Sequence, residues 1–306
     1  MHPSTISTKE TQFADSLNAA GTKYTLVGTT DIPGGFTIRS IRPSALTYFY
    51  QTETEKKTIC LHFTVGYIMS DIPALTKSTS HVSVSYVVDR AGRIYELFPD
   101  KYWSYHLGSG TIGGNATMSK KSIGIEISNY GPLELKSGKL IDCYGNTYCS
   151  ESETDLYDSH EYRGKKYYAT MTGEQIAAVK ALVEYLCDKH AIPLNFITDD
   201  NPFKSEQDAL GFTGIFFHSN VRKDKFDWPL SKSMSALVKL CTEQPEDVAE
   251  PETEPVPEPV AETTPEPEQP KPAPIEEPAM AEPRGSSKSG LLGKIIEFLT
   301  KLLRKN

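Results

Sequence analysis

The chain has 306 residues, of which 38% are hydrophobic, so it can form one large domain or two small ones with a hydrophobic core. Its formal net charge of −8 is unevenly distributed: residues 243–284 contain 13 acidic and 2 basic residues, residues 285–306 contain 5 basic residues and 1 acidic residue, and residues 1–242 retain about −1. This near neutrality argues against nucleic acid as a partner, because binding it requires a basic surface.

The N-terminal residues 1–10 lack the basic start and the following apolar run of a secretory signal. The sequence also has no apolar segment of about 18 residues, so no membrane-spanning helix is expected. We therefore expect a protein that is made in the cytoplasm without a signal peptide.

Residues 1–56 show no strong periodic pattern. Within them, 24–28 and 36–41 read as short strands that Pro33-Gly34-Gly35 separates. We expect residues 1–56 to form an N-terminal extension packed on the core, either as an elaboration of the core sheet or as a lid. Nothing in this segment suggests chemistry.

Residues 57–64 form a short apolar run of strand length. His62 would therefore emerge at a strand end, where side chains from several elements can converge on a metal. Strands are also expected at 83–88 and 93–97, with a turn at 89–92 between them.

A further strand is expected at 122–128. Glu126 lies in it with an isoleucine on each side, so the two-residue alternation of a strand points its carboxylate away from its apolar neighbours. Burying a carboxylate is costly. We therefore interpret Glu126 as a functional residue, with a structural hydrogen bond as the alternative.

Residues 131–168 are polar, rich in tyrosine and interrupted by glycines, and we interpret them as an insertion that borders the site if the preceding strand does. The clearest helix follows at 172–190, where Thr172 and Gln175 match a capping box and apolar residues recur on one face. Strands alternating with few helices predict an α/β domain over 57–242, with a mixed central β-sheet flanked by helices.

A split zinc site is suggested by His62 together with His218 and Asp227 far downstream. Two imidazoles and one carboxylate leave the fourth tetrahedral position open for water, which is typical of catalytic zinc. Lys225 adds a cation where an oxyanion could develop. Short-range zinc motifs are absent from the sequence, so only folding could assemble this site.

The cysteines number five. Cys60, Cys187 and Cys241 lie in apolar contexts and read as reduced core residues. Cys143 and Cys149 bracket a turn-like sequence, and they either form a hairpin disulfide in an oxidising compartment or remain reduced.

The C-terminal part of the chain differs in composition from the rest. Residues 243–286 are rich in proline and glutamate and are expected to form a disordered, extended spacer; 12 of the 21 prolines lie after residue 242. Residues 287–306 predict a cationic amphipathic helix suited to an anionic membrane or outer-membrane surface. A coiled-coil or docking helix is the alternative, because the apolar spacing also fits heptads.

Several of these motifs occur together, in the order 58–64, 86–97, 105–108, 122–127 and 218–227. In this combination the chain resembles the zinc-dependent N-acetylmuramoyl-L-alanine amidases, which include phage endolysins, bacterial wall-recycling amidases and animal peptidoglycan recognition proteins. The resemblance covers roughly Lys57 to Leu240.

The resemblance implies a role for each candidate residue. His62, His218 and Asp227 would be the Zn²⁺ ligands. Glu126 would occupy the acid/base position, and Lys225 the position that stabilises the tetrahedral intermediate. His106 would face the substrate groove. The resemblance thus implies two catalytic residues, Glu126 and Lys225, one substrate-binding residue, His106, and three metal-binding residues, His62, His218 and Asp227.

Two departures from the family pattern stand out. Many relatives carry an aromatic-His pair where this chain has Val84-Ser85, and many continue with Asp-Pro-Gly where this chain has Asp227-Trp228-Pro229. The loop after Asp227 must therefore turn differently.

The resemblance implies hydrolysis of the amide bond between N-acetylmuramic acid and L-alanine in bacterial peptidoglycan, by a phage-type lysin that acts on the cell wall after release. Two alternatives remain open. One is a peptidoglycan-binding module without catalysis, and the other is a virion-associated or delivery protein in which 287–306 docks on a partner.

Overall fold

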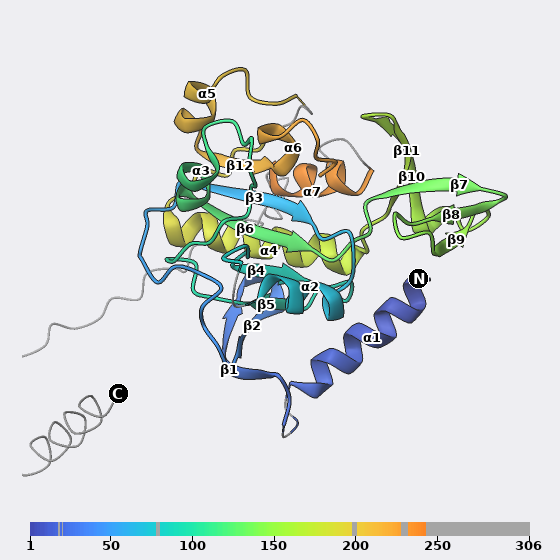
Figure 1. Ribbon diagram of the computed structural model, residues 1–306, viewed down its shortest axis with the longest axis horizontal. Coiled ribbons are helices and arrows are strands. Elements are labelled where there is room, and N and C mark those ends of the chain that lie inside the picture. The colour runs from blue at the N-terminus through green and yellow to red at the C-terminus, as the bar shows by residue number, and fades with distance from the viewer. Residues whose placement is uncertain (18, 20, 78–79, 198–200, 228–231, 243–306) are drawn as a thin grey trace, which may run out of the picture. The chain divides into compact units, whose positions relative to one another are not determined.

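The computed structural model describes residues 1–17, 19, 21–77, 80–197, 201–227 and 232–242 (Figure 1). The spacer predicted at 243–286 and the amphipathic helix predicted at 287–306 lie outside these residues. So does the turn expected at Trp228-Pro229.

A mixed sheet of seven strands forms the centre of the fold, in the order β1-β2-β5-β4-β6-β3-β12. Its strands are β1 (Tyr24–Ile32), β2 (Phe36–Pro43), β3 (Thr58–Phe63), β4 (Tyr86–Val88), β5 (Ile94–Glu96), β6 (Ser122–Ile127) and β12 (Gly214–Phe217). The strands β12, β3, β6 and β4 run parallel, and antiparallel pairs β4–β5 and β1–β2 complete the sheet. The predicted α/β class with a mixed central sheet is confirmed.

Helices flank this sheet. They are α1 (Pro3–Ser16), α2 (Ile68–Leu75), α3 (Asn115–Lys121), α4 (Gly173–His190), α5 (Glu206–Gly211), α6 (His218–Val221) and α7 (Lys232–Thr242), with single 3₁₀ turns at Pro33–Gly35 and Thr154–Leu156. The helix predicted at 172–190 is α4, and Thr172 and Gln175 form its capping box. Figure 1 shows α4 running along the sheet behind β6.

Every residue of β3 is buried, because helices or loops cover both faces of this central strand. Alternate residues therefore enter different cores. Ile59 and Leu61 belong to the large cluster with α4 and α7, whereas Cys60 packs with residues of α3, α5 and α6. His62 continues the second series, so it lies on the sheet face opposite α4.

The sequence pattern did not predict the helix α1. It did predict the two short strands in residues 1–56, which are parts of β1 and β2. Glu10 explains the difference. It lies between Ile6 and Phe13 on the buried face of α1, so a carboxyl group interrupts the apolar pattern. The carboxylate is satisfied inside the protein by the Ile68 N–H at 3.3 Å, the Arg90 N–H at 2.9 Å and the Ser128 hydroxyl at 2.6 Å.

The segment interpreted as an insertion forms a separate antiparallel sheet of five strands, in the order β10-β11-β7-β8-β9. These strands are β7 (Pro132–Lys136), β8 (Lys139–Ile141), β9 (Thr147–Ser150), β10 (Tyr157–Tyr162) and β11 (Lys165–Ala169). Figure 1 shows this second sheet beyond the carboxyl ends of β3 and β6.

Gly131 allows the chain to pass from β6 into the second sheet. Its φ is +63°, and a Cβ atom there would lie 2.2 Å from the Phe63 ring. Only glycine accommodates both the backbone conformation and this close approach.

Cys60, Cys187 and Cys241 are buried free thiols, as predicted, and Cys143 and Cys149 are also unpaired. Among the described residues, no helix combines the length and apolarity needed to cross a bilayer.

Candidate metal centre

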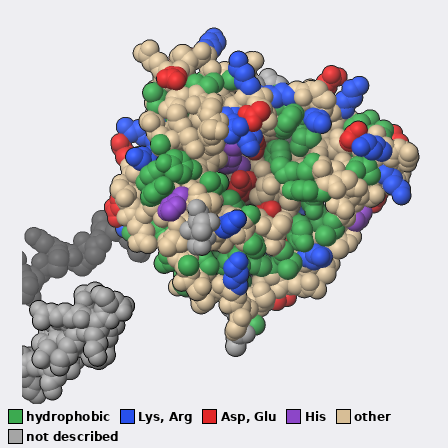
Figure 2. Space-filling model, in the orientation of Figure 1, with side chains coloured by type: hydrophobic (Ala, Val, Ile, Leu, Met, Phe, Trp, Pro, Cys, Tyr) green, Lys and Arg blue, Asp and Glu red, His purple; other side chains and the backbone are tan. Residues whose placement is uncertain are grey.

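The site begins at the carboxyl ends of two neighbouring parallel strands. His62 on β3 is in register with Glu126 on β6. Residues paired in this way point to the same face of a sheet, so the two side chains leave the sheet together. Figure 2 shows histidine and acidic side chains gathered in a hollow near the centre of the face in view, with basic side chains beside them.

The three predicted metal ligands come together. One ligand atom from each of His62, His218 and Asp227 lies within 4.8 Å of the other two. The two Nδ1 atoms of the histidines are 2.9 Å apart, and His218 Nδ1 is 3.9 Å from Asp227 Oδ2. All three side chains are buried.

Asp227 is held in place from two sides. Its Oδ1 accepts a hydrogen bond from the Phe63 N–H at 2.9 Å, which links it to the residue after His62. Its carbonyl oxygen accepts one from the Ser219 hydroxyl in α6. These two hydrogen bonds fix the position of Asp227 beside the histidines. The loop after Asp227 lies outside the described residues.

The hydrogen-bond partners assign the protons on the histidine rings. The Ser122 hydroxyl donates to the Met118 carbonyl at 2.7 Å, so its oxygen accepts from His106 Nε2 at 2.8 Å. Neutral His106 then offers Nδ1 as an acceptor to His62 Nε2, 3.0 Å away. His218 Nε2 donates to the Leu107 carbonyl at 2.8 Å.

Both Nδ1 atoms are consequently unprotonated and present lone pairs to each other. Burial lowers the pKa of His62 well below its usual value and that of His218 to about 3, so neither ring takes up a proton at neutral pH. Two lone pairs facing each other beside a carboxylate repel unless a cation lies between them. The donor set therefore fits a divalent metal ion.

A second set of potential ligands, Cys60, His62 and His106, also lies within 4.8 Å. Burial raises the pKa of the Cys60 thiol well above its usual value, which disfavours the thiolate that binds metals. Both nitrogens of His106 are already engaged in hydrogen bonds. The set with Asp227 is the better metal site.

His106 was expected to face the substrate groove, and the structure places its ring behind His62. The ring lies against Gly124 of β6, where a Cβ atom would be 3.1 Å from His106 Nδ1 and 2.8 Å from Val84 Cγ1. Val84, one of the two residues that replace the aromatic-His pair of many relatives, thus packs on the same strand. The structure therefore shows His106 bonded to His62, and its predicted contact with substrate stays a prediction.

Glu126 is half-buried, and its Oε2 atom has no hydrogen-bond partner among the described residues. Burial is the main reason why its pKa is raised well above the usual value, and the charges of Asp227 and Asp71 add to this effect. The alternative of a structural hydrogen bond receives no support at Oε2. A buried, unpaired carboxyl oxygen beside a metal site is typical of an acid/base group.

Lys225 is half-buried and supplies positive charge to the whole site. Its charge lowers the pKa values of His62 and His218 and opposes the rise at Glu126 and Asp227. One ammonium group therefore acts on all four of these candidate residues.

Arg163, at the tip of the β10–β11 hairpin, is a further residue of the site that the sequence did not reveal. Its Nη1 donates to the carbonyls of Arg222, Lys223 and Lys225 at 2.9, 3.0 and 2.5 Å, and its Nη2 to that of Ser219 at 3.1 Å. The second sheet thereby clamps the segment that carries Lys225. The only local signal is the Arg-Gly turn, which does not indicate its partners.

Solved structures that resemble this chain include two described as amidases and one described as a hydrolase. The N-acetylmuramyl-L-alanine amidase AmiD from E. coli is 20% identical over 55% of this chain and 54% of its own, with a TM-score of 0.32, so the chain spans about half of AmiD. The Staphylococcus aureus hydrolase AmiA is 14% identical over 69% of this chain and 83% of its own, with a TM-score of 0.36. The N-acetylmuramoyl-L-alanine amidase LysC from Clostridium intestinale URNW is 14% identical over 66% of this chain and 95% of its own, with a TM-score of 0.32.

A search of curated proteins found no match. The family model described as N-acetylmuramoyl-L-alanine amidase matches residues 52–241, a span that contains all of the candidate site residues. Because this match extends over more than half of the 306 residues, the chain belongs to the N-acetylmuramoyl-L-alanine amidase family.

Proposed function

We propose that this protein hydrolyses the amide bond between N-acetylmuramic acid and L-alanine in bacterial peptidoglycan, with Zn²⁺ held by His62, His218 and Asp227. The observation that carries the proposal is the pair of Nδ1 atoms 2.9 Å apart beside the Asp227 carboxylate, which the hydrogen-bond partners assign as unprotonated. Two histidines and one carboxylate form a known ligand set of catalytic zinc. When bound, zinc polarises a carbonyl oxygen and makes a water molecule more acidic.

Glu126 and Lys225 perform the remaining chemistry. As water adds to the amide carbon, Glu126 takes one of its protons and passes it to the alanine nitrogen, and the carbon–nitrogen bond breaks. Its unpaired Oε2 is the atom available for this proton. Lys225 stabilises the negative charge that develops on the carbonyl oxygen.

Purified peptidoglycan tests the reaction. We expect the zinc-loaded protein to release new alanine amino groups without new reducing sugar ends, and His218→Ala to release neither. Reducing ends would identify a glycosidase. Binding of peptidoglycan without release of either group would identify a recognition module without catalysis.

Glu126→Gln separates metal binding from proton transfer. This variant keeps the size of the side chain but cannot accept the proton, so we expect zinc to remain bound while turnover falls by about 10²- to 10⁴-fold. Zinc content and turnover are measured on the same sample. Turnover equal to that of the wild type would remove Glu126 from the mechanism.

We also propose a biological setting, a phage-type lysin whose residues 287–306 contact an anionic bacterial envelope. The support is the sequence alone, which combines an apolar series with cationic residues in this segment. Circular dichroism of the 287–306 peptide should show a gain of helix on adding anionic vesicles. No gain would favour the alternative, a helix that docks on a partner protein.

A further inference from the structure

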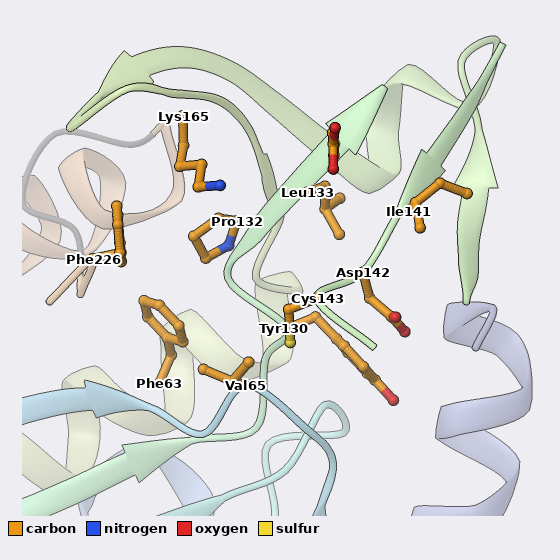
Figure 3. Close-up of a pocket in the computed structure, with 11 residues that line it drawn as sticks. Phe63, Val65, Tyr130, Pro132, Leu133, Ile141, Asp142, Cys143, Lys165 and Phe226 are labelled. Carbon is orange, nitrogen blue, oxygen red and sulfur yellow. The ribbon is translucent and has the colours of Figure 1, made fainter. Parts of the chain in front are cut away.

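A cavity of about 220 Å³ lies between the main sheet and the second sheet. Figure 3 shows side chains from both sheets around it. Its apolar lining includes Phe63, Val65, Leu133, Ile141 and Phe226, and Lys165 lies at its rim.

The cavity adjoins the candidate metal centre through the chain itself. Phe63 follows the ligand His62, and Phe226 lies between Lys225 and Asp227. The Phe63 N–H also binds Asp227 Oδ1 at 2.9 Å, so the two walls meet at the metal site. The wall of this cavity is therefore one residue away from two of the candidate metal ligands, His62 and Asp227.

Lys165 is the lining cation whose charge is available to a ligand. No hydrogen bond or ion pair of its ammonium group is found within the described part of the chain. Figure 3 shows the amine end of Lys165 directed over Pro132 toward the cavity. Lys166 is the next residue on β11, and alternation along a strand turns it to the other face.

The acidic lining residues already have cationic partners. Glu134 pairs with Lys136 at 2.9 Å, and Asp142 pairs with the N-terminal ammonium of Met1 at 3.3 Å. The free charge at this cavity is consequently positive, which suits an anionic ligand group attached to an apolar part.

The backbone that carries Lys165 is fixed relative to the metal site. Arg163, two residues earlier, binds four carbonyl oxygens of the segment between Ser219 and Lys225. One of these residues, Ser219, also donates its hydroxyl hydrogen bond to the Asp227 carbonyl, so Lys165 and Asp227 are linked through Arg163 and Ser219. A fixed spacing between a charge and a reacting bond is what substrate selection requires.

We propose that this cavity binds the stem peptide of peptidoglycan and that Lys165 pairs with a free carboxylate of that peptide. The inference rests on the proposed function and specifies which side of the scissile bond the second sheet recognises. The substrate in the AmiD structure contains D-gamma-Glu, a glutamate joined through its side chain, so the α-carboxylate of that residue is free. The muramic carboxyl group is consumed in the amide bond, and the sugar side offers Lys165 no such anion.

Two muropeptides that differ only at this group test the proposal, one with the α-carboxylate and one with the α-carboxamide. We expect Lys165→Met to lower kcat/KM for the carboxylate substrate roughly tenfold, the size expected for one charge-assisted hydrogen bond. The carboxamide substrate should be cleaved equally by both proteins. Lys166→Met is the matched control and should leave both rates unchanged. Equal losses on both substrates, or no loss on either, would overturn the assignment.

Binding to Glu126→Gln, measured by calorimetry, keeps this question separate from turnover. The carboxylate muropeptide should bind about tenfold more tightly than the carboxamide, and adding Lys165→Met should abolish that difference. If the wild type cleaved neither muropeptide but this difference in binding remained, the proposed hydrolysis would fail and the subsite would stand. Equal binding of both muropeptides would remove the subsite while leaving hydrolysis intact.

Discussion

The carbonyl oxygen of Met118 determines the proton positions on a series of side chains that ends at the metal site. It accepts the Ser122 proton, which makes Ser122 an acceptor for His106 and His106 an acceptor for His62. Each neutral ring has one donor and one acceptor nitrogen, so one assignment determines the next. The result is that His62 Nδ1 is unprotonated where it faces His218 and the Asp227 carboxylate.

Replacing His106 with alanine removes the acceptor of the His62 Nε2 proton. We expect zinc affinity to fall by about 10- to 100-fold, the usual effect of losing the partner behind a histidine ligand. Competition with a chelator measures this without substrate. His160→Ala, in β10 of the second sheet, is the control and should bind zinc normally. Normal zinc affinity with a raised KM in His106→Ala would instead favour direct substrate contact.

At the scale of elements, the β10–β11 hairpin supports the loop of the main domain that contributes Lys225. Arg163→Ala removes the guanidinium donor from four carbonyl oxygens. We expect a loss of stability of at least about 1.5–3 kcal/mol, the range for a hydrogen bond to a charged group. Faster hydrogen exchange at 219–227 should accompany a lower kcat.

Arg163→Lys serves as the comparison, because it keeps the charge but lacks the planar fork that reaches several carbonyls. We expect Arg163→Lys to restore only part of the protection of residues 219–227 against hydrogen exchange. Exchange at 219–227 as slow as in the wild type in both variants would show that the hairpin does not hold this loop.

The helix α2 contains a buried carboxyl group in its first turn, Asp71. Its Oδ1 accepts a hydrogen bond from the Ser70 hydroxyl at 3.1 Å, whereas Oδ2 has no partner among the described residues. Burial is the main cause that raises the pKa of Asp71 to about 7. The group is therefore protonated in the folded protein under mildly acidic conditions.

Stability should consequently fall as pH rises from about 4 to 7. Over this range the unfolded chain loses the Asp71 proton while the folded chain keeps it, so the unfolded state binds fewer protons. Below this range both states are protonated, and above it both are ionised. The pKa values in the two states differ by about three units, so the free energy of unfolding should fall by at most on the order of 4 kcal/mol.

Urea unfolding at pH 5 and pH 7.5 measures this effect. Between pH 5 and pH 7.5 the wild-type protein should lose more stability than Asp71→Asn, because the asparagine side chain is neutral at both pH values. Parallel changes in the two proteins would show that Asp71 ionises normally in the folded state.

At the scale of the whole molecule, residues 1–248 make up the first of two units into which the chain divides. Both sheets and the candidate metal centre belong to that first unit. We expect a 1–248 truncation to keep its thermal unfolding midpoint and its turnover of soluble muropeptides within about twofold. Binding to anionic vesicles should be lost.

Assays of full-length and truncated proteins with the same muropeptide check this prediction. A large fall in soluble turnover would show that the C-terminal segment takes part in the site. Equal vesicle binding by the two proteins would place any envelope contact in the first unit.

Local patterns were sufficient for the class of the fold. The apolar runs at 57–64 and 122–128 and the capping box of α4 each depend on neighbours close in sequence. The helix α1 escaped prediction because Glu10 interrupts its apolar face, and its partners Ile68, Arg90 and Ser128 are distant in sequence.

The sequence by itself determined the residue types of the site, because imidazoles, a carboxylate and a lysine in family-like motifs indicate metal chemistry wherever they fold. Tertiary structure alone decided which nitrogen of each histidine is free, that Arg163 holds the loop, and that Lys165 faces a cavity beside Phe63 and Phe226. These features depend on contacts between strands that lie far apart along the chain. No local periodicity encodes them.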